Sequence, residues 1–185
     1  MISVPPPRIF LLLLLCMGAT IIAQTGPKVP LGMNPTMSIA ENTGNSDNHT
    51  FLLAAIKATD LEGLLDMEGP FTVFAPSDKA FEKLTPSKID FLLMPENKKA
   101  LRSLLTYHIV AGSISASKIL SALCHGNGKT SFTTVQGTKI TATMDGLDII
   151  LTDYLGNSAK IITADANQCN GVIHEIDGVI LPQKI

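Results

Sequence analysis

The first regular hydrophobic spacing in the chain lies between residues 47 and 66. Apolar residues recur there every three or four positions, as one face of an amphipathic helix requires: Phe51, Leu52, Ala55, Ile56 and Ala58. Asp47 or Asn48 precedes this pattern, and one of the two is expected to be the N-cap. A second, short helical turn is expected over residues 61–66.

A strand and three short helices are predicted for residues 69–108. The segment "GPFTVFAP" (69–76) is rich in residues that favour strands, and Pro76 ends it. Ser77 is placed to cap the next helix, and Thr85 followed by Pro86 indicates another, because proline is tolerated at the first helical position. A third helix is expected from Pro95 onward, with an apolar stripe of Ala100, Leu101, Leu104 and Leu105.

Short strands are predicted from about residue 131 to the end of the chain. Four or five β-rich runs are separated by the dipeptides Gln136-Gly137, Asp145-Gly146 and Gly156-Asn157, which supply the positive φ angles that tight hairpins need. Helices therefore occupy the first half, and a meander of hairpins occupies the second, joined by one early strand. This segregation predicts an α+β fold.

The N-terminus has the layout of a secretory signal peptide over residues 1–23. Arg8 is followed by an apolar run from Ile9 to about Ile22, which is too short and too close to the terminus for a membrane-spanning helix. Cys16 offers a weaker alternative, a lipoprotein cysteine. Residues 24–34 are expected to form a tether, and residues 35–182 a single domain in a secreted protein with no membrane span after cleavage.

Charge excludes one broad class of partner. Without Arg8, 13 Lys and Arg residues face 16 Asp and Glu residues, a net charge of −3. Nucleic-acid binding usually requires a basic surface, so no nucleic-acid partner is expected.

Two cysteines, Cys124 and Cys169, remain after cleavage of the signal peptide. An even number of cysteines in an oxidising compartment favours one disulfide between them. Two unpaired thiols are the alternative, because the distance between the residues cannot be derived from the sequence.

The segment "GVIHEIDGVILP" (171–182) places polar residues inside an apolar strand pattern. At a period of two, His174 falls on the side of Val172 and Ile176, while Glu175 falls on the other side. A catalytic strand, a metal site and a structural strand with a hydrogen-bonded core histidine are all compatible with this pattern. The last is favoured, because a lone histidine among apolar residues is usually a core residue.

Motifs that would indicate an enzyme are missing from the sequence. It contains no Gly-x-Ser-x-Gly, no phosphate loop and no dinucleotide fingerprint. The four histidines are scattered singly, without the short spacings of a zinc site. Asp148, Asp153, Asp165 and Asp177 lie in or beside predicted strands, but the sequence does not show whether any two are close enough for acid–base chemistry.

Three ordered segments resemble the signature blocks of the fasciclin domain family: "TVFAPSDKAF" (72–81), "LLTYHIV" (104–110) and "NGVIHEIDGVILP" (170–182). The resemblance covers about residues 35–182 and implies a wedge-like β-sandwich of about seven strands with helices packed around it. It implies no cofactor; the missing motifs and the scattered histidines above also predict no metal site and no catalytic residues. His174 resembles the core histidine of the family's terminal strand, and small secreted single-domain members are common in bacteria.

The resemblance also implies a role in adhesion at a cell surface or in a matrix. In animal members the region matching Tyr107 and His108 is associated with integrin-mediated adhesion, although apolar neighbours such as Leu104 and Ile109 favour a structural role for the pair. Cys124 and Cys169 depart from the family pattern, so we expect a bridge between the loop of Cys124 and the start of the last strand.

The expected function is a secreted, non-catalytic adhesion module whose partner is a cell-surface or matrix protein or polysaccharide. A carrier of a small apolar ligand with the same fold is the alternative. Asn48-His49-Thr50 matches a glycosylation acceptor triplet, which is meaningful in a eukaryotic secretory pathway. The oligomeric state stays open.

Overall fold

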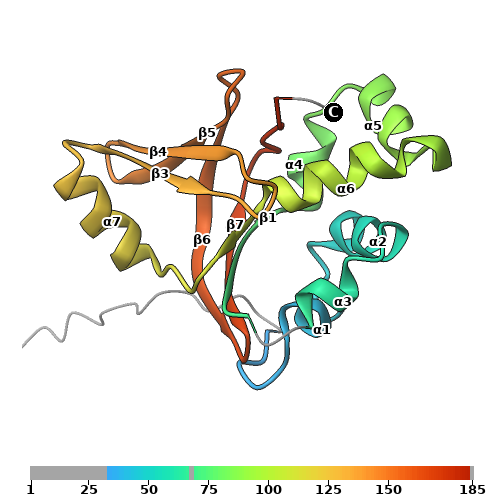
Figure 1. Ribbon diagram of the computed structural model, residues 1–185, viewed down its shortest axis with the longest axis horizontal. Coiled ribbons are helices and arrows are strands. Elements are labelled where there is room, and N and C mark those ends of the chain that lie inside the picture. Colours follow the sequence, from blue (N-terminus) through green and yellow to red (C-terminus); the bar gives the residue numbers. More distant parts are fainter. Residues whose placement is uncertain (1–32, 67–68, 184–185) are drawn as a thin grey trace, which may run out of the picture.

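The computed structural model describes residues 33–66 and 69–183 (Figure 1). The predicted signal peptide (1–23) and all but the last two residues of the predicted tether (24–34) lie outside these residues. The elements in chain order are α1 (Ile39–Gly44), α2 (Thr50–Ala58), α3 (Glu62–Leu65), β1 (Phe71–Pro76), α4 (Asp78–Glu82), α5 (Pro86–Leu93), the 3-10 helix η1 (Pro95–Asn97), α6 (Lys98–Tyr107), β2 (Ile109–Ala111), α7 (Ala116–His125), β3 (Lys129–Thr133), β4 (Lys139–Asp145), β5 (Asp148–Thr152), β6 (Ser158–Gln168) and β7 (Gly171–Ile176).

Local sequence signals account for the starts of two predicted helices. The Ser77 hydroxyl accepts a hydrogen bond from the Ala80 N–H at 3.3 Å and caps α4, as predicted. Pro86 occupies the first turn of α5, also as predicted, because its missing N–H would have no partner there. The predicted third helix begins as the short η1 turn at Pro95 and continues as α6.

The start of α2 differs from the sequence prediction. Neither Asp47 nor Asn48 is its N-cap; that position is His49, whose side chain makes no capping hydrogen bond. The Asp78 carboxylate, from α4, instead accepts the N–H groups of Thr50 at 3.1 Å and Phe51 at 2.9 Å. The cap is therefore supplied by a residue far away in the sequence, because α2 and α4 pack together.

Two helices, α1 and α7, were not predicted from the sequence. The α1 helix has a complete capping box, in which Ser38 and Glu41 bond to each other's backbone N–H groups. The α7 helix begins at the cap Ser115 and buries Ile119 and Leu123. Because α7 extends to His125, Cys124 lies in a helix and not in the Gly/Asn-rich loop to which it was assigned.

Within the described residues the strands form one mixed sheet in the order β2-β1-β7-β6-β5-β4-β3. β1 and β7 run parallel, and every other neighbouring pair is antiparallel. β6 has two register shifts and joins the two halves of the sheet. A bridge between Val110 and Thr134 links the opposite edges, so the sheet nearly closes on itself. The predicted α+β fold, with seven strands in a wedge and helices around it, is confirmed.

Two apolar clusters flank β7. Ile173 belongs to a cluster that also contains residues of α1 to α6, whereas Ile176 belongs to a second cluster with residues of α7, β4 and β5. In Figure 1, α7 lies on one side of the sheet and the other helices lie on the opposite side. Both faces of β7 are therefore buried, which explains why it carries apolar side chains on both faces.

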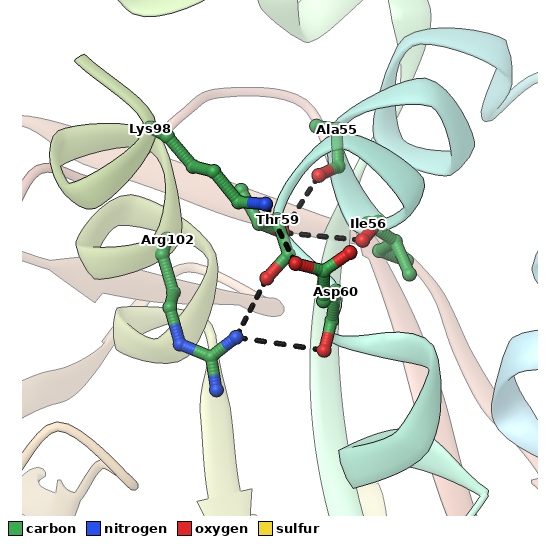
Figure 2. Close-up of polar contacts among 6 residues, drawn as sticks. All are labelled: Ala55, Ile56, Thr59, Asp60, Lys98 and Arg102. Carbon is green, nitrogen blue, oxygen red and sulfur yellow. Dashed lines mark hydrogen bonds and ion pairs between the residues drawn. The ribbon is translucent and has the colours of Figure 1, made fainter. Parts of the chain in front are cut away.

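The C-terminal end of α2 is joined to α6, the helix that ends at Tyr107 (Figure 2). Arg102 donates to the backbone carbonyl of Thr59 at 2.6 Å, and Lys98 pairs with the Asp60 carboxylate at 2.6 Å. Cations at a helix C-terminus offset the partial negative charge of its unpaired carbonyls. These contacts fix the position of α6. They thereby also fix Tyr107 and His108 at its C-terminal end, which we call the Tyr-His turn.

Candidate functional site

The Tyr107–His108 pair lies at the junction between α6 and β2 and is buried. The Tyr107 side chain is 1% exposed, and its hydroxyl donates a hydrogen bond to the Lys139 carbonyl at 3.0 Å. Burial raises the pKa of Tyr107, and the nearby Asp153 carboxylate adds to the rise. The ring is therefore part of the core, and Tyr107 also lines the surface hollow described below.

His108 connects three parts of the fold. Its Nδ1–H donates to the Leu104 carbonyl at 2.8 Å, and its Nε2 accepts the Ile180 N–H at 3.3 Å. Its backbone carbonyl also accepts the Phe74 N–H at 2.9 Å. Burial lowers the pKa of His108 to about 4, so the ring is neutral at physiological pH. Both ring nitrogens are engaged, as a structural histidine requires.

His174 occupies a similar position in the middle of β7, where it is fully buried. Its Nδ1 accepts the Asp165 N–H at 3.2 Å, its Nε2–H donates to the Ile114 carbonyl at 2.8 Å, and its ring stacks on Phe74. Burial lowers its pKa below the ordinary value. The imidazole thus joins a bulge of β6 to the segment that enters α7.

The four aspartates considered for acid–base chemistry are engaged separately in structural contacts. Asp148 pairs with Lys160, Asp177 with Lys83, and Asp165 accepts the Ala116 N–H at the start of α7. Asp153 organises the turn between β5 and β6. Its carboxylate accepts hydrogen bonds from four donors: the N–H groups of Leu155, Asn157 and Leu181, and the Asn157 amide.

A surface hollow of about 300 Å³ lies beside this turn, and we call it the Tyr154 hollow. Four segments meet there: the end of α6, the β3–β4 turn with the start of β4, the β5–β6 turn and the C-terminal segment. Its lining residues are Tyr107, Gly137, Thr138, Lys139, Thr141, Asp153, Tyr154 and Gln183. Tyr154 is 70% exposed and the adjoining Leu155 is 60% exposed. The sequence analysis missed both; a turn containing Gly156 was the one signal that pointed to their exposure.

The predicted disulfide between Cys124 and Cys169 is wrong, because both residues are exposed free thiols. Cys124 lies in α7, which packs on β3 and β4, and Cys169 lies in the β6–β7 hairpin. The Cys169 N–H donates to the Met37 carbonyl, so this hairpin is attached to the N-terminal segment and not to the region of α7. Figure 1 shows α7 and the hairpin in separate parts of the molecule.

No group of three or more His, Cys, Asp or Glu side chains within residues 33–66 and 69–183 is placed to hold a metal ion. None of the helices in the described part of the chain is both long enough and apolar enough to cross a membrane.

The nearly closed mixed sheet, the helices on both of its sides and the buried Tyr-His turn define the class of protein: a fasciclin-type domain. A solved pair of such domains, from the insect cell adhesion molecule fasciclin I, matches it with a TM-score of 0.67 over 80% of this chain and 51% of that chain. The sequence identity is 17%, so this likeness establishes the fold alone.

The Fasciclin domain model matches residues 47–182, and the chain belongs to the fasciclin domain family. It is 39% identical over 146 residues to protein sll1483 of Synechocystis, covering 79% of this chain and 74% of that protein. It is 32% identical over 162 residues to the cell surface glycolipoprotein MPB83 of Mycobacterium bovis, covering 85% and 66%. The family is one of non-catalytic adhesion domains, and the chain is accordingly not an enzyme.

Proposed function

We propose that the protein is exported and acts as a single-domain adhesion module at a cell surface or in a matrix, by direct contact with a protein or glycan. Membership of the fasciclin family supports the adhesive role. One relative is named as a cell-surface protein, and the solved fasciclin I pair belongs to a cell adhesion molecule. In this proposal residues 1–23 direct export, and residues 35–182 form the domain.

The observation that carries the proposal is the exposure of Tyr154 and Leu155 at the Tyr154 hollow. Large apolar side chains that stand together on a fixed turn are typical of contact surfaces, because they bury substantial area at little cost in conformational entropy. The four hydrogen bonds to Asp153 hold this turn before any partner arrives. Partner binding therefore does not need to order the turn.

In our proposal Tyr107 and His108 act mainly as supports of this surface, and Tyr107 also lines the hollow. The Tyr107 hydroxyl bonds to the carbonyl of Lys139, a residue that lines the hollow. His108 holds the N–H of Ile180, the neighbour of Leu181, which in turn donates to Asp153. A change at either residue would act on adhesion indirectly, through the shape of the hollow.

The described N-terminal segment is attached far from the Tyr154 hollow. The Met37 carbonyl accepts the Cys169 N–H in the β6–β7 hairpin, whereas the β5–β6 turn lies at the other end of β6. A strand of 11 residues spans roughly 30 Å. Figure 1 shows α1 and this hairpin together, at the opposite end of β6 from the β5–β6 turn. If the protein is held at the cell surface through its N-terminus, the Tyr154 hollow faces away from that surface.

Co-sedimentation with envelopes and matrix polymer from the source cells tests the proposal. The mature chain, residues 24–185, should bind saturably, and Tyr154→Ala should bind more weakly while keeping the wild-type melting temperature. Leu147→Ala is the matched control, because Leu147 is 97% exposed but lies in the β4–β5 turn, at the other end of β5. Absence of saturable binding by the wild type would contradict the proposal. Native mass spectrometry would then show whether an apolar ligand accompanies the protein, as the carrier alternative requires.

A further inference from the structure

The side chains that line the Tyr154 hollow combine one exposed aromatic ring with several neutral polar groups. The neutral polar residues are Thr138, Thr141 and Gln183, and the aromatic residue is Tyr154. The Thr138 hydroxyl also lies 3.4 Å from the Thr134 hydroxyl. A ligand that fits this lining has a flat apolar face and hydroxyl groups around its edge. We propose that the Tyr154 hollow binds a sugar ring of a surface or matrix polysaccharide, a proposal that rests on the adhesive function above and names its partner.

The carboxylate of Asp153, which also lines the hollow, already accepts hydrogen bonds from the protein. Its two oxygens accept four hydrogen bonds within the protein, at 2.7 to 2.9 Å. Three of these come from Leu155 and Asn157, on either side of Gly156, and fix the backbone next to Tyr154. The ring of Tyr154 is thus presented on a rigid support, which lowers the entropy lost when a ligand stacks on it.

Ring stacking and hydrogen bonding act on different parts of a sugar. The face of an aromatic ring carries partial negative charge, so it attracts the C–H groups on the apolar face of a pyranose. The equatorial hydroxyls then point sideways, toward the polar residues of the lining. A purely apolar ligand would offer those residues no hydrogen bonds, which costs binding free energy.

Lys139 decides which sugars bind best. Among the described residues it is the one cationic residue of the lining, and its own carbonyl already accepts the Tyr107 hydroxyl. A carboxylate on a uronic acid would gain from this ammonium group, whereas a neutral hexose would not. The stacking platform serves both sugars, so Tyr154 is required for either, and Lys139 is required for the acidic one alone.

Binding measurements on the folded mature chain test this inference. The probes are neutral glucan, mannan and galactan oligosaccharides and uronate oligosaccharides, measured by titration calorimetry. At least one probe should bind, and Tyr154→Ala should weaken binding by about tenfold or more, as loss of an aromatic anchor does. Tyr154→Phe should stay within about threefold of the wild type, because the ring is kept. Lys139→Gln should weaken binding of uronate alone.

Leu147→Ala is again the matched control and should bind like the wild type. No binding of any probe at millimolar concentration would overturn the inference, as would binding that Tyr154→Ala leaves unchanged. A loss that Leu147→Ala shares equally would also overturn it, because that variant alters a surface on another part of the sheet.

A second measurement separates this inference from the proposed function. Periodate cleaves the carbon–carbon bond between neighbouring hydroxyls of a sugar and leaves two aldehydes, with periodate reduced to iodate. Envelope binding that periodate treatment abolishes supports the sugar. Binding that survives the treatment and still requires Tyr154 would contradict the proposed sugar ligand. The adhesive function would then stand, with a protein as partner. Failure to bind untreated envelopes, alongside tight binding of an oligosaccharide, contradicts the adhesive function and keeps the sugar site.

Discussion

The Nε2 atom of His108 accepts a hydrogen bond from the backbone N–H of Ile180, 72 residues further along the chain. The other ring nitrogen donates to the Leu104 carbonyl. This arrangement requires the neutral ring, because a protonated Nε2 has no lone pair to accept with. The Tyr-His turn and the C-terminal segment are therefore held together by a contact that depends on pH.

The first prediction follows from the protonation of buried histidines. His108 has a pKa of about 4 in the folded state and an ordinary pKa near 6.5 when unfolded, so between these values the unfolded chain binds more protons. Its contribution to stability is complete above pH 6.5 and is lost as the pH falls toward 4. The free energy of unfolding should drop by about 2 kcal/mol between pH 7.5 and 5 from this residue alone. Urea unfolding at both pH values measures the change.

Burial also lowers the pKa of His49 and of His174, so both add to the loss of stability in the same direction. The variant His108→Gln should show a shallower pH dependence than the wild type. Equal stability of the wild-type protein at pH 7.5 and pH 5 would contradict this account.

The second prediction concerns the parallel pairing of β1 with β7. Gly171 lies opposite Phe71, and a Cβ atom at Gly171 would overlap the Phe71 carbonyl. Gly171→Ala should therefore destabilise the fold by about 3 kcal/mol or more, since only a backbone shift relieves the clash. Gly63→Ala is the control: it lies in α3 with open space around it and should stabilise the protein by about 0.5–1 kcal/mol. Chemical denaturation of both variants measures these two changes in the free energy of unfolding.

The third prediction tests the remote cap of α2. Burial acts to raise the pKa of Asp78, but hydrogen bonds from Thr50 and Phe51 outweigh it, and the pKa lies below its ordinary value. Asp78→Ala should cost about 1–2 kcal/mol of stability, as loss of a helix cap does. Asp47→Ala, at the position favoured by the sequence pattern, should change little. A larger loss for Asp47→Ala than for Asp78→Ala would show that the cap is local after all.

The fourth prediction concerns Cys124 and Cys169. Because both are exposed free thiols, a thiol-reactive dye should label two cysteines per molecule of the native mature chain. A reducing agent should leave the melting temperature unchanged. If the native protein reacts with no dye until it is reduced, the two cysteines form a disulfide, contrary to this prediction.

Local signals predicted much of the fold because they depend on residues close together in the sequence. The cap Ser77, the helix-starting Pro86 and the Gly-containing turns act within a few residues and lie where they were expected. The capping box of α1, Ser38 followed three residues later by Glu41, is also a local signal in the sequence. It was not used to predict a helix, because the segment before it is rich in Gly and Pro.

The features of the site depend instead on residues that folding brings together. Asp78 caps α2 from another helix, and Asp153 bonds to Leu181 across 28 positions. Tyr107 and Tyr154 border one hollow, yet one is buried and the other exposed. The apolar neighbours of Tyr107 and the Gly156 turn beside Tyr154 indicate this difference in exposure. No spacing in the sequence places both tyrosines at one hollow, because that depends on which segments meet there.

Hydrogen–deuterium exchange of the mature chain, with and without envelope fragments from its source cells, tests the central claim most directly. Contact through the Tyr154 hollow predicts slower exchange in the β3–β4 and β5–β6 turns, and unchanged exchange in the β6–β7 hairpin. Protection confined to that hairpin, or to the β4–β5 turn at Leu147, would contradict the claim and place the adhesive surface elsewhere.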